Sequence, residues 1–80
     1  MPETSKDKPV RISTAAEAAG VSRQTVEYYI TLGLVRPIRP PRSRARLFDE
    51  KLIQRIRLIR RLNESGYTLR DIRDIYLKDR

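Results

Sequence analysis

Ten basic side chains, nine of them arginines, lie close together between Val35 and Arg61 of this 80-residue sequence. Only two acidic residues, Asp49 and Glu50, fall in the same segment, and the rest of the chain is balanced, so this segment carries the whole net charge of +8. The planar guanidinium group suits phosphate oxygens and guanine edges. Such a concentration of one charge predicts an extended polyanion as the partner.

Other kinds of chemistry have little material to draw on. The sequence contains no histidine and no cysteine. The commonest general base, the thiolate nucleophile and the nitrogen and sulfur ligands of metals are therefore missing. Aromatic residues make up only 6% of the chain, which leaves little for an apolar ligand pocket. We expect no enzyme, no metal site and no cofactor.

The length and the ends of the chain predict one small domain. Eighty residues support a single core, which we place over residues 10–80, after a polar and disordered tail over residues 1–9. No apolar run approaches the roughly 20 residues of a membrane span, and the lack of cysteine fits a reducing compartment. We expect a cytoplasmic, nucleoid-associated protein that does not contact membranes.

Two short helices are predicted before the basic segment. Ser13 and a Thr14-x-x-Glu17 capping pair start the first helix, and Gly20 ends it. Ser22 caps the second helix, which continues to Leu32 and has one apolar face. Because a tight Gly-Val-Ser turn joins the two helices, the pattern indicates a helix-turn-helix.

The basic segment itself predicts a projecting arm, followed by two more helices. Prolines 37, 40 and 41 forbid a helix between Leu34 and Phe48, so we expect a two-stranded β-hairpin wing there. Asp49 caps a third helix and Thr68 a fourth. Their predicted core residues are Leu52, Ile53, Ile56, Ile59, Leu62, Leu69, Ile72, Ile75 and Tyr76. The predicted fold class is mostly α, a winged helix-turn-helix of four helices with a short two-stranded β-hairpin wing.

Six separated motifs and the start of the first helix resemble one known family. They are Ile12-Ser13, Gly20-Val21-Ser22, Thr25-Val26, Tyr28-Tyr29, Leu32-Gly33-Leu34, Arg46-Leu47-Phe48-Asp49 and Gly66-Tyr67-Thr68-Leu69. In this order and spacing they resemble the MerR (mercury-resistance regulator) family. The resemblance implies a bacterial regulator that binds double-stranded DNA, with the second helix in the major groove and the wing on the backbone. It also implies a homodimer and RNA polymerase at a promoter as partners to consider.

The resemblance gives roles to individual residues, and the sequence also departs from it. Gln24 and Glu27 fall on groove-facing positions, Tyr28 and Tyr29 on an aromatic pair near phosphate, and Arg46 on the wing arginine. The family usually has arginine at position 27, and a glycine-tyrosine pair where this chain has Arg44-Ala45. A further family wing arginine falls on Pro40, and the family continues beyond residue 80 into a dimerisation helix and an effector domain.

The candidate DNA-binding residues lie on the second helix and the wing. Ser22, Arg23 and Gln24, in the first turn of the helix, are expected to reach base edges or phosphates. For Glu27 three roles stay open, namely an ion pair with Arg23, readout of a cytosine amino group, and a weakened DNA contact. We assign Tyr29 to packing and the Tyr28 hydroxyl to the neighbourhood of a phosphate.

The arginines divide into two groups. At least two of the wing arginines, which are Arg39, Arg42, Arg44 and Arg46, are expected to contact the DNA backbone. Arg55, Arg57, Arg60 and Arg61 on the third helix are interpreted as a solvated surface.

Three functions remain as hypotheses. The first is a sequence-specific transcription regulator with the recognition helix Ser22 to Leu32 and the wing Arg36 to Phe48. The second is an architectural or recombination accessory DNA-binding protein of the excisionase kind. The third is an adaptor that uses the same fold to bind an acidic protein surface.

Overall fold

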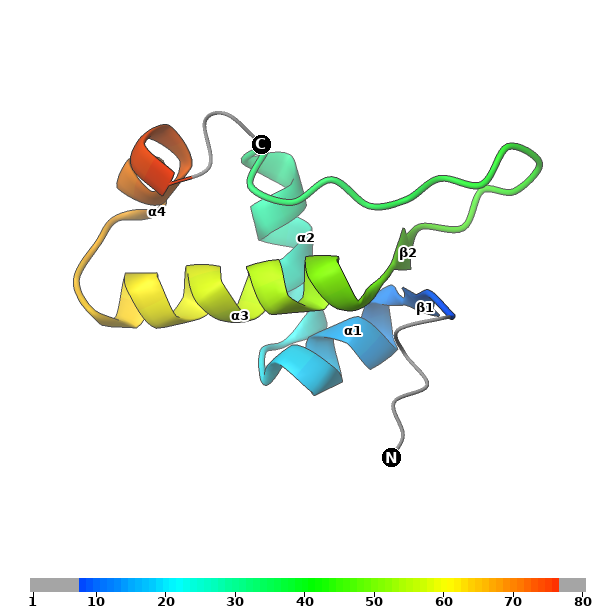
Figure 1. The fold of residues 1–80 in the computed structure, drawn as a ribbon, viewed down its shortest axis with the longest axis horizontal. Helices are drawn as coiled ribbons and strands as arrows, with labels where there is room; N and C mark the ends of the chain where they lie inside the picture. The colour runs from blue at the N-terminus through cyan, green and yellow to red at the C-terminus, as the bar shows by residue number, and fades with distance from the viewer. Residues whose placement is uncertain (1–7, 77–80) are drawn as a thin grey trace.

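A computed structural model describes residues 8–76 of the chain. The elements in order are β1 (Val10–Arg11), α1 (Ile12–Ala19), α2 (Arg23–Thr31), β2 (Leu47–Phe48), α3 (Glu50–Glu64), α4 (Leu69–Asp71) and a π-helical continuation, η2 (Ile72–Tyr76). Figure 1 shows the long α3 helix with α1 against it, α2 packed against α1, and α4 near the C-terminal end of α3. The mostly helical fold class is confirmed. Most of the expected tail, residues 1–7, lies outside the described residues.

The turn between α1 and α2 follows from Gly20 and Ser22. Gly20 has a φ of 77°, and its N–H donates to the Glu17 carbonyl at 3.1 Å. A Cβ there would be strained in conformation and would also come within 2.6 Å of the Arg60 guanidinium. Ser22 caps α2 as predicted, because its Oγ accepts from the Thr25 N–H at 3.0 Å.

The start of α1 differs from the prediction. The helix begins at Ile12, and its N-cap is Arg11, whose side chain makes no capping hydrogen bond. The predicted Ser13 cap is wrong because Arg11 is held extended by strand pairing, so the chain enters the helix directly after β1. The first turn of α1 therefore has no side-chain cap.

The strand pairing also corrects the prediction. β2 pairs antiparallel with β1, with Val10 opposite Phe48 and Arg11 opposite Leu47, rather than within a hairpin. The two arms of the expected wing meet at one bridge, Ile38 to Leu47, with hydrogen bonds of 2.8 and 2.9 Å. Prolines 37, 40 and 41 lack N–H donors and so restrict further pairing. The outer part of the expected wing, residues 39–46, extends sideways from the helices in Figure 1. From here on, "the wing" means this shorter segment.

Most of the predicted core is confirmed. Asp49 and Thr68 cap α3 and α4, and Ile53, Ile56, Ile59 and Ile72 are buried around Phe48 and Val26. Leu52, Leu62 and Leu69 are partly buried against this cluster. Ile75 is exposed instead, because the wider π-helical turn rotates it away from the face that Ile72 occupies. The Tyr76 side chain lies outside the described part of the structure.

Phe48 is fully buried at the end of β2, and it joins the strand pair to the helical core. Replacing it with alanine is expected to lower the free energy of unfolding by about 3 to 5 kcal/mol, the usual cost of deleting a buried phenyl ring. Urea unfolding followed by circular dichroism measures this change. The matched control, Ile75→Ala, is expected to cost no more than about 0.5 kcal/mol because its side chain is exposed. Equal losses would contradict this account of the core.

Candidate nucleic-acid interface

The outer face of α2 is open. Val26 and Tyr29 hold the helix against the core, while the opposite side lines a shallow groove of about 440 Å³. The groove residues are Ser22, Gln24, Thr25, Glu27, Tyr28 and Thr31. Arg23 at the start of the helix has a 62% exposed side chain, and Gln24 is exposed beside it. Four of the predicted helix residues, Ser22, Gln24, Glu27 and Tyr28, thus share one accessible face, and Arg23 lies outside the groove.

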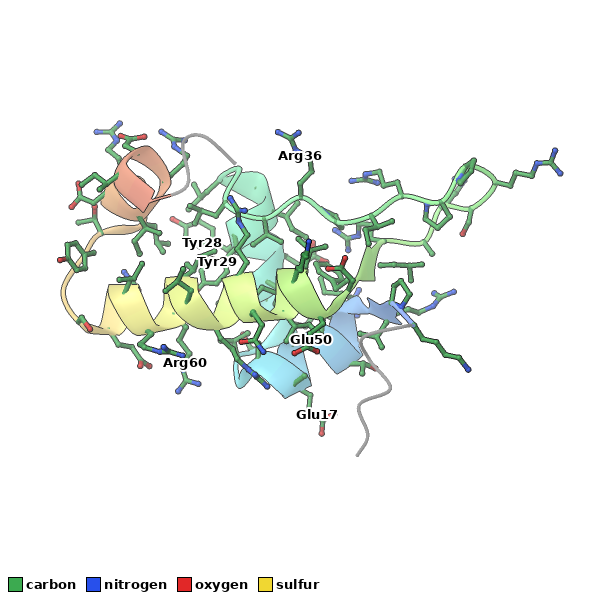
Figure 2. All side chains as sticks on the ribbon, viewed as in Figure 1. Glu17, Tyr28, Tyr29, Arg36, Glu50 and Arg60 are labelled. Carbon is green, nitrogen blue, oxygen red and sulfur yellow. The ribbon has the colours of Figure 1, made fainter. Side chains whose placement is uncertain are left out.

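Ser22 and Tyr29 stabilise the helix and its packing, whereas Tyr28 is exposed on the open face. The Ser22 hydroxyl is already engaged in capping, and it also shares a hydrogen bond of 2.9 Å with the Thr25 hydroxyl. Tyr29 is only 5% exposed, and burial raises the pKa of its phenol, which agrees with its predicted packing role. Tyr28 is 54% exposed. Figure 2 labels both side chains on α2 above α3.

The strongest polar contact of the site joins α2 to the wing. Arg46 donates from Nη1 to Oε1 of Glu27 at 2.8 Å and from Nη2 to Oε2 at 2.7 Å. This two-pronged contact, which we call the Glu27–Arg46 fork, is the charge-assisted geometry that guanidinium and carboxylate groups prefer. Hydrogen bonding from Arg46 lowers the pKa of Glu27, and hydrogen bonding to Glu27 raises the pKa of Arg46.

The fork changes the interpretation of Glu27. The ion pair expected with Arg23 is present but longer, with 3.9 Å between Nε and Oε2. The main partner, Arg46, lies 19 residues away and was missed. The unusual acid at position 27 could have pointed to it, because a carboxylate on a helix expected to face DNA is stabilised by a nearby cation.

The wing arginines are consequently not equivalent. The side chain of Arg46 is 27% exposed, and both terminal nitrogens of its guanidinium group, Nη1 and Nη2, donate hydrogen bonds to Glu27. Arg39, Arg42 and Arg44 are exposed along the projecting wing. Arg36, just before the wing, also points away from the helices in Figure 2. The cations free to meet an anion are therefore chiefly the outer ones.

Two arginines of α3 support the scaffold rather than forming a solvated surface. Arg57 donates from Nε and Nη2 to the Ala18 carbonyl in the last turn of α1, at 3.3 and 2.8 Å. Arg55 donates to the Leu34 carbonyl at 2.9 Å. Carbonyls at the end of a helix lack partners within it, so Arg57 satisfies the one at Ala18 from outside. Arg60 pairs with Glu64 at 3.0 Å, and Arg61 is exposed as expected.

Neither a metal cluster nor a membrane-spanning helix is found in the described region. Over residues 8–76, no three acidic, histidine or cysteine side chains gather where they could hold a metal ion. Within the same residues, no helix is both long and apolar enough to cross a bilayer.

Comparison with known sequences places this chain in a family. The sequence profile described as "MerR HTH family regulatory protein" matches residues 10–78. The regulator CueR of Bacillus subtilis is 41% identical over 64 residues, which are 80% of this chain and 44% of that protein. The mercuric resistance operon regulatory protein of Bacillus cereus is 32% identical over 62 residues, or 78% of this chain and 47% of that protein.

Two solved structures share the fold. The lead(II) complex of the transcription regulator PbrR691 from Ralstonia metallidurans superposes with a TM-score of 0.77 at 34% identity, covering 88% of this chain and 56% of that one. HiNmlR, a MerR family regulator lacking the sensor domain and bound to promoter DNA, gives a TM-score of 0.73 at 29% identity, covering 82% and 52%. This chain spans about half the length of the relatives that it matches. With its sequence profile, its curated relatives and its fold in agreement, the chain belongs to the MerR helix-turn-helix family of regulatory proteins.

Proposed function

We propose that this chain is the DNA-binding part of a sequence-specific transcription regulator of MerR type. It binds double-stranded DNA with α2 in the major groove and the wing along the phosphate backbone. The observation that carries this proposal is the joint presentation of an open α2 face and an arginine-rich wing, which the Glu27–Arg46 fork holds together.

The position of α2 supports readout of bases. Residues in the first turn of the second helix reach base edges in helix-turn-helix proteins. Arg23 and Gln24 occupy this turn and are exposed, while Val26 and Tyr29 fix the helix from behind. A rigid helix with polar residues at its tip reads sequence, with Arg23 suited to guanine and Gln24 to adenine.

The wing supplies the contacts that do not depend on sequence. Arg39, Arg42 and Arg44 are exposed and repel one another in the free protein. DNA phosphates relieve this repulsion, and the release of condensed counterions drives binding. Arg46 is assigned a different part, because Glu27 already neutralises it. Arg46 positions the wing, and we assign the phosphate contacts to Arg39, Arg42 and Arg44 instead.

One relative supports the promoter as the target. HiNmlR lacks the sensor domain and was captured on promoter DNA. That protein therefore binds promoter DNA without a sensor domain. For this chain we infer promoter DNA as the partner, with a homodimer on a palindromic site and RNA polymerase as further partners of the same assembly.

Selection of bound sequences from a random duplex pool at a stated salt concentration tests the proposal. We expect a palindromic consensus, and affinity that falls steeply as salt rises. Binding without any consensus would favour the architectural alternative, and no binding to duplex at low salt would exclude both DNA-binding functions.

Gln24→Ala is expected to relax the preference for one base pair in each half-site, by about 1 to 3 kcal/mol, because it removes a base-edge contact. Fluorescence anisotropy with the consensus and with single-base variants measures this loss. The matched control is Gln54→Ala on α3, where the amide pairs with Glu50. An unchanged preference in Gln24→Ala would remove this residue from the readout.

Glu27→Ala is expected to release Arg46 and steepen the dependence of log affinity on log salt by about 0.9, the contribution of one added phosphate contact. Arg46→Ala is expected to leave that slope unchanged, because the fork already neutralises this arginine. Anisotropy titrations at several salt concentrations give both slopes. The reverse pattern, a shallower slope in Arg46→Ala and none steeper in Glu27→Ala, would mean that Arg46 contacts phosphate itself.

A further inference from the structure

A small hollow lies where the start of α1, the start of α2 and the base of the wing come together. Its volume is about 270 Å³, and its polar lining consists of Arg11, Ser13, Arg23, Arg44 and Arg46. In Figure 1 this junction lies beside β1, at the end of the molecule from which the wing extends. Arg11 and Ser13 are not among the residues that the sequence predicted to bind DNA.

The charge of the hollow is strongly positive. Four of its lining residues are arginines, and the carboxylate of Glu27 reaches two of them, Arg23 and Arg46. Glu27 accepts hydrogen bonds from both Nη atoms of Arg46, and its Oε2 lies 3.9 Å from the Nε of Arg23. It neutralises one of the four guanidinium groups, so Arg11 and Arg44 provide charge that Glu27 does not balance. An anion in the hollow would bring these arginines together without repulsion.

The backbone of α1 adds to this charge. The eight-residue helix begins at Ile12 without a side-chain cap and without an acidic residue in its first turn. Its first N–H groups thus carry the positive end of the helix dipole with no side-chain acceptor from the cap. Ser13 adds an exposed hydroxyl beside them. Guanidinium groups, a hydroxyl and a helix start together match the oxygens of a phosphate group.

We propose that this hollow binds one phosphate group of the DNA backbone, beside the groove that α2 enters. The proposal rests on the proposed function and adds a site to it. Arg23 belongs both to the hollow and to the reading turn of α2, so the bound phosphate lies next to the bases being read. A phosphate contact at that place fixes the register of the helix on the duplex.

Salt titrations of duplex binding test whether Arg11 and Arg44 serve a single phosphate. The variants are Arg11→Ala, Arg44→Ala, their double mutant and Ser13→Ala. The control is Arg61→Ala, which removes the same charge from a hollow beside Ala19, at the other end of α1. Thermal unfolding followed by circular dichroism confirms that each variant is folded.

We expect the double mutant to flatten the slope of log affinity against log salt by about 0.9 in total, the value for one phosphate. Each single mutant loses no more than this. Ser13→Ala lowers affinity by about tenfold or more, as for one hydrogen bond to a charged acceptor, and leaves the slope unchanged. Arg61→Ala keeps the wild-type slope. A double mutant that loses about 1.8 would mean two separate phosphates, and one that loses nothing would remove the site.

A scan with methylphosphonate substitutions, which remove the charge of one phosphate at a time, identifies the source of the anion. We expect one position per half-site where the wild type loses affinity and the double mutant does not. A parallel titration of the free protein with inorganic phosphate, followed by amide NMR shifts at Ser13 and Thr14, reports free-phosphate binding. Shifts there without any such position in the scan would overturn the duplex assignment. Wild-type duplex binding is measured separately. If the wild type does not bind the duplex, the proposed function fails; if it binds but the double mutant keeps the wild-type slope, only the phosphate site fails.

Discussion

The geometry of the candidate DNA-binding surface depends on the Glu27–Arg46 fork. The wing has few other ties, since its arms meet at the single bridge between Ile38 and Leu47 and its prolines restrict further pairing. Two charge-assisted hydrogen bonds of 2.7 and 2.8 Å join its base to the middle of α2. The helix that we propose to read bases and the wing that we propose to meet the backbone are thereby held as one unit, and Arg46 is neutralised within it.

The arginines therefore have three distinct roles in one small domain. Arg55 and Arg57 complete the hydrogen bonding of carbonyls at Leu34 and Ala18 and so fasten α3 to the helix-turn-helix. Arg46 orients the wing, and the exposed arginines remain for the polyanion. Net charge alone overstates the charge available to DNA, because part of it already stabilises the fold.

Local features of the fold could be predicted from the sequence, and contacts between distant residues could not. The caps at Ser22, Asp49 and Thr68 were correct because a cap and its helix are neighbours in the chain. The pairing of β1 with β2, the fork, and the contact of Arg57 with Ala18 join residues 19 to 39 positions apart. No local pattern identifies such partners, although the acid at position 27 indicates that a cation lies nearby. The first of these also moved the N-cap of α1 from Ser13 to Arg11.

We infer that the fork makes the wing a rigid extension of α2. Backbone ¹⁵N relaxation over residues 44–46, in the wild type and in Glu27→Ala, measures this most directly. We predict order parameters near the roughly 0.85 of rigid backbone in the wild type and below about 0.6 in the variant. Equal values in the two proteins would contradict the claim.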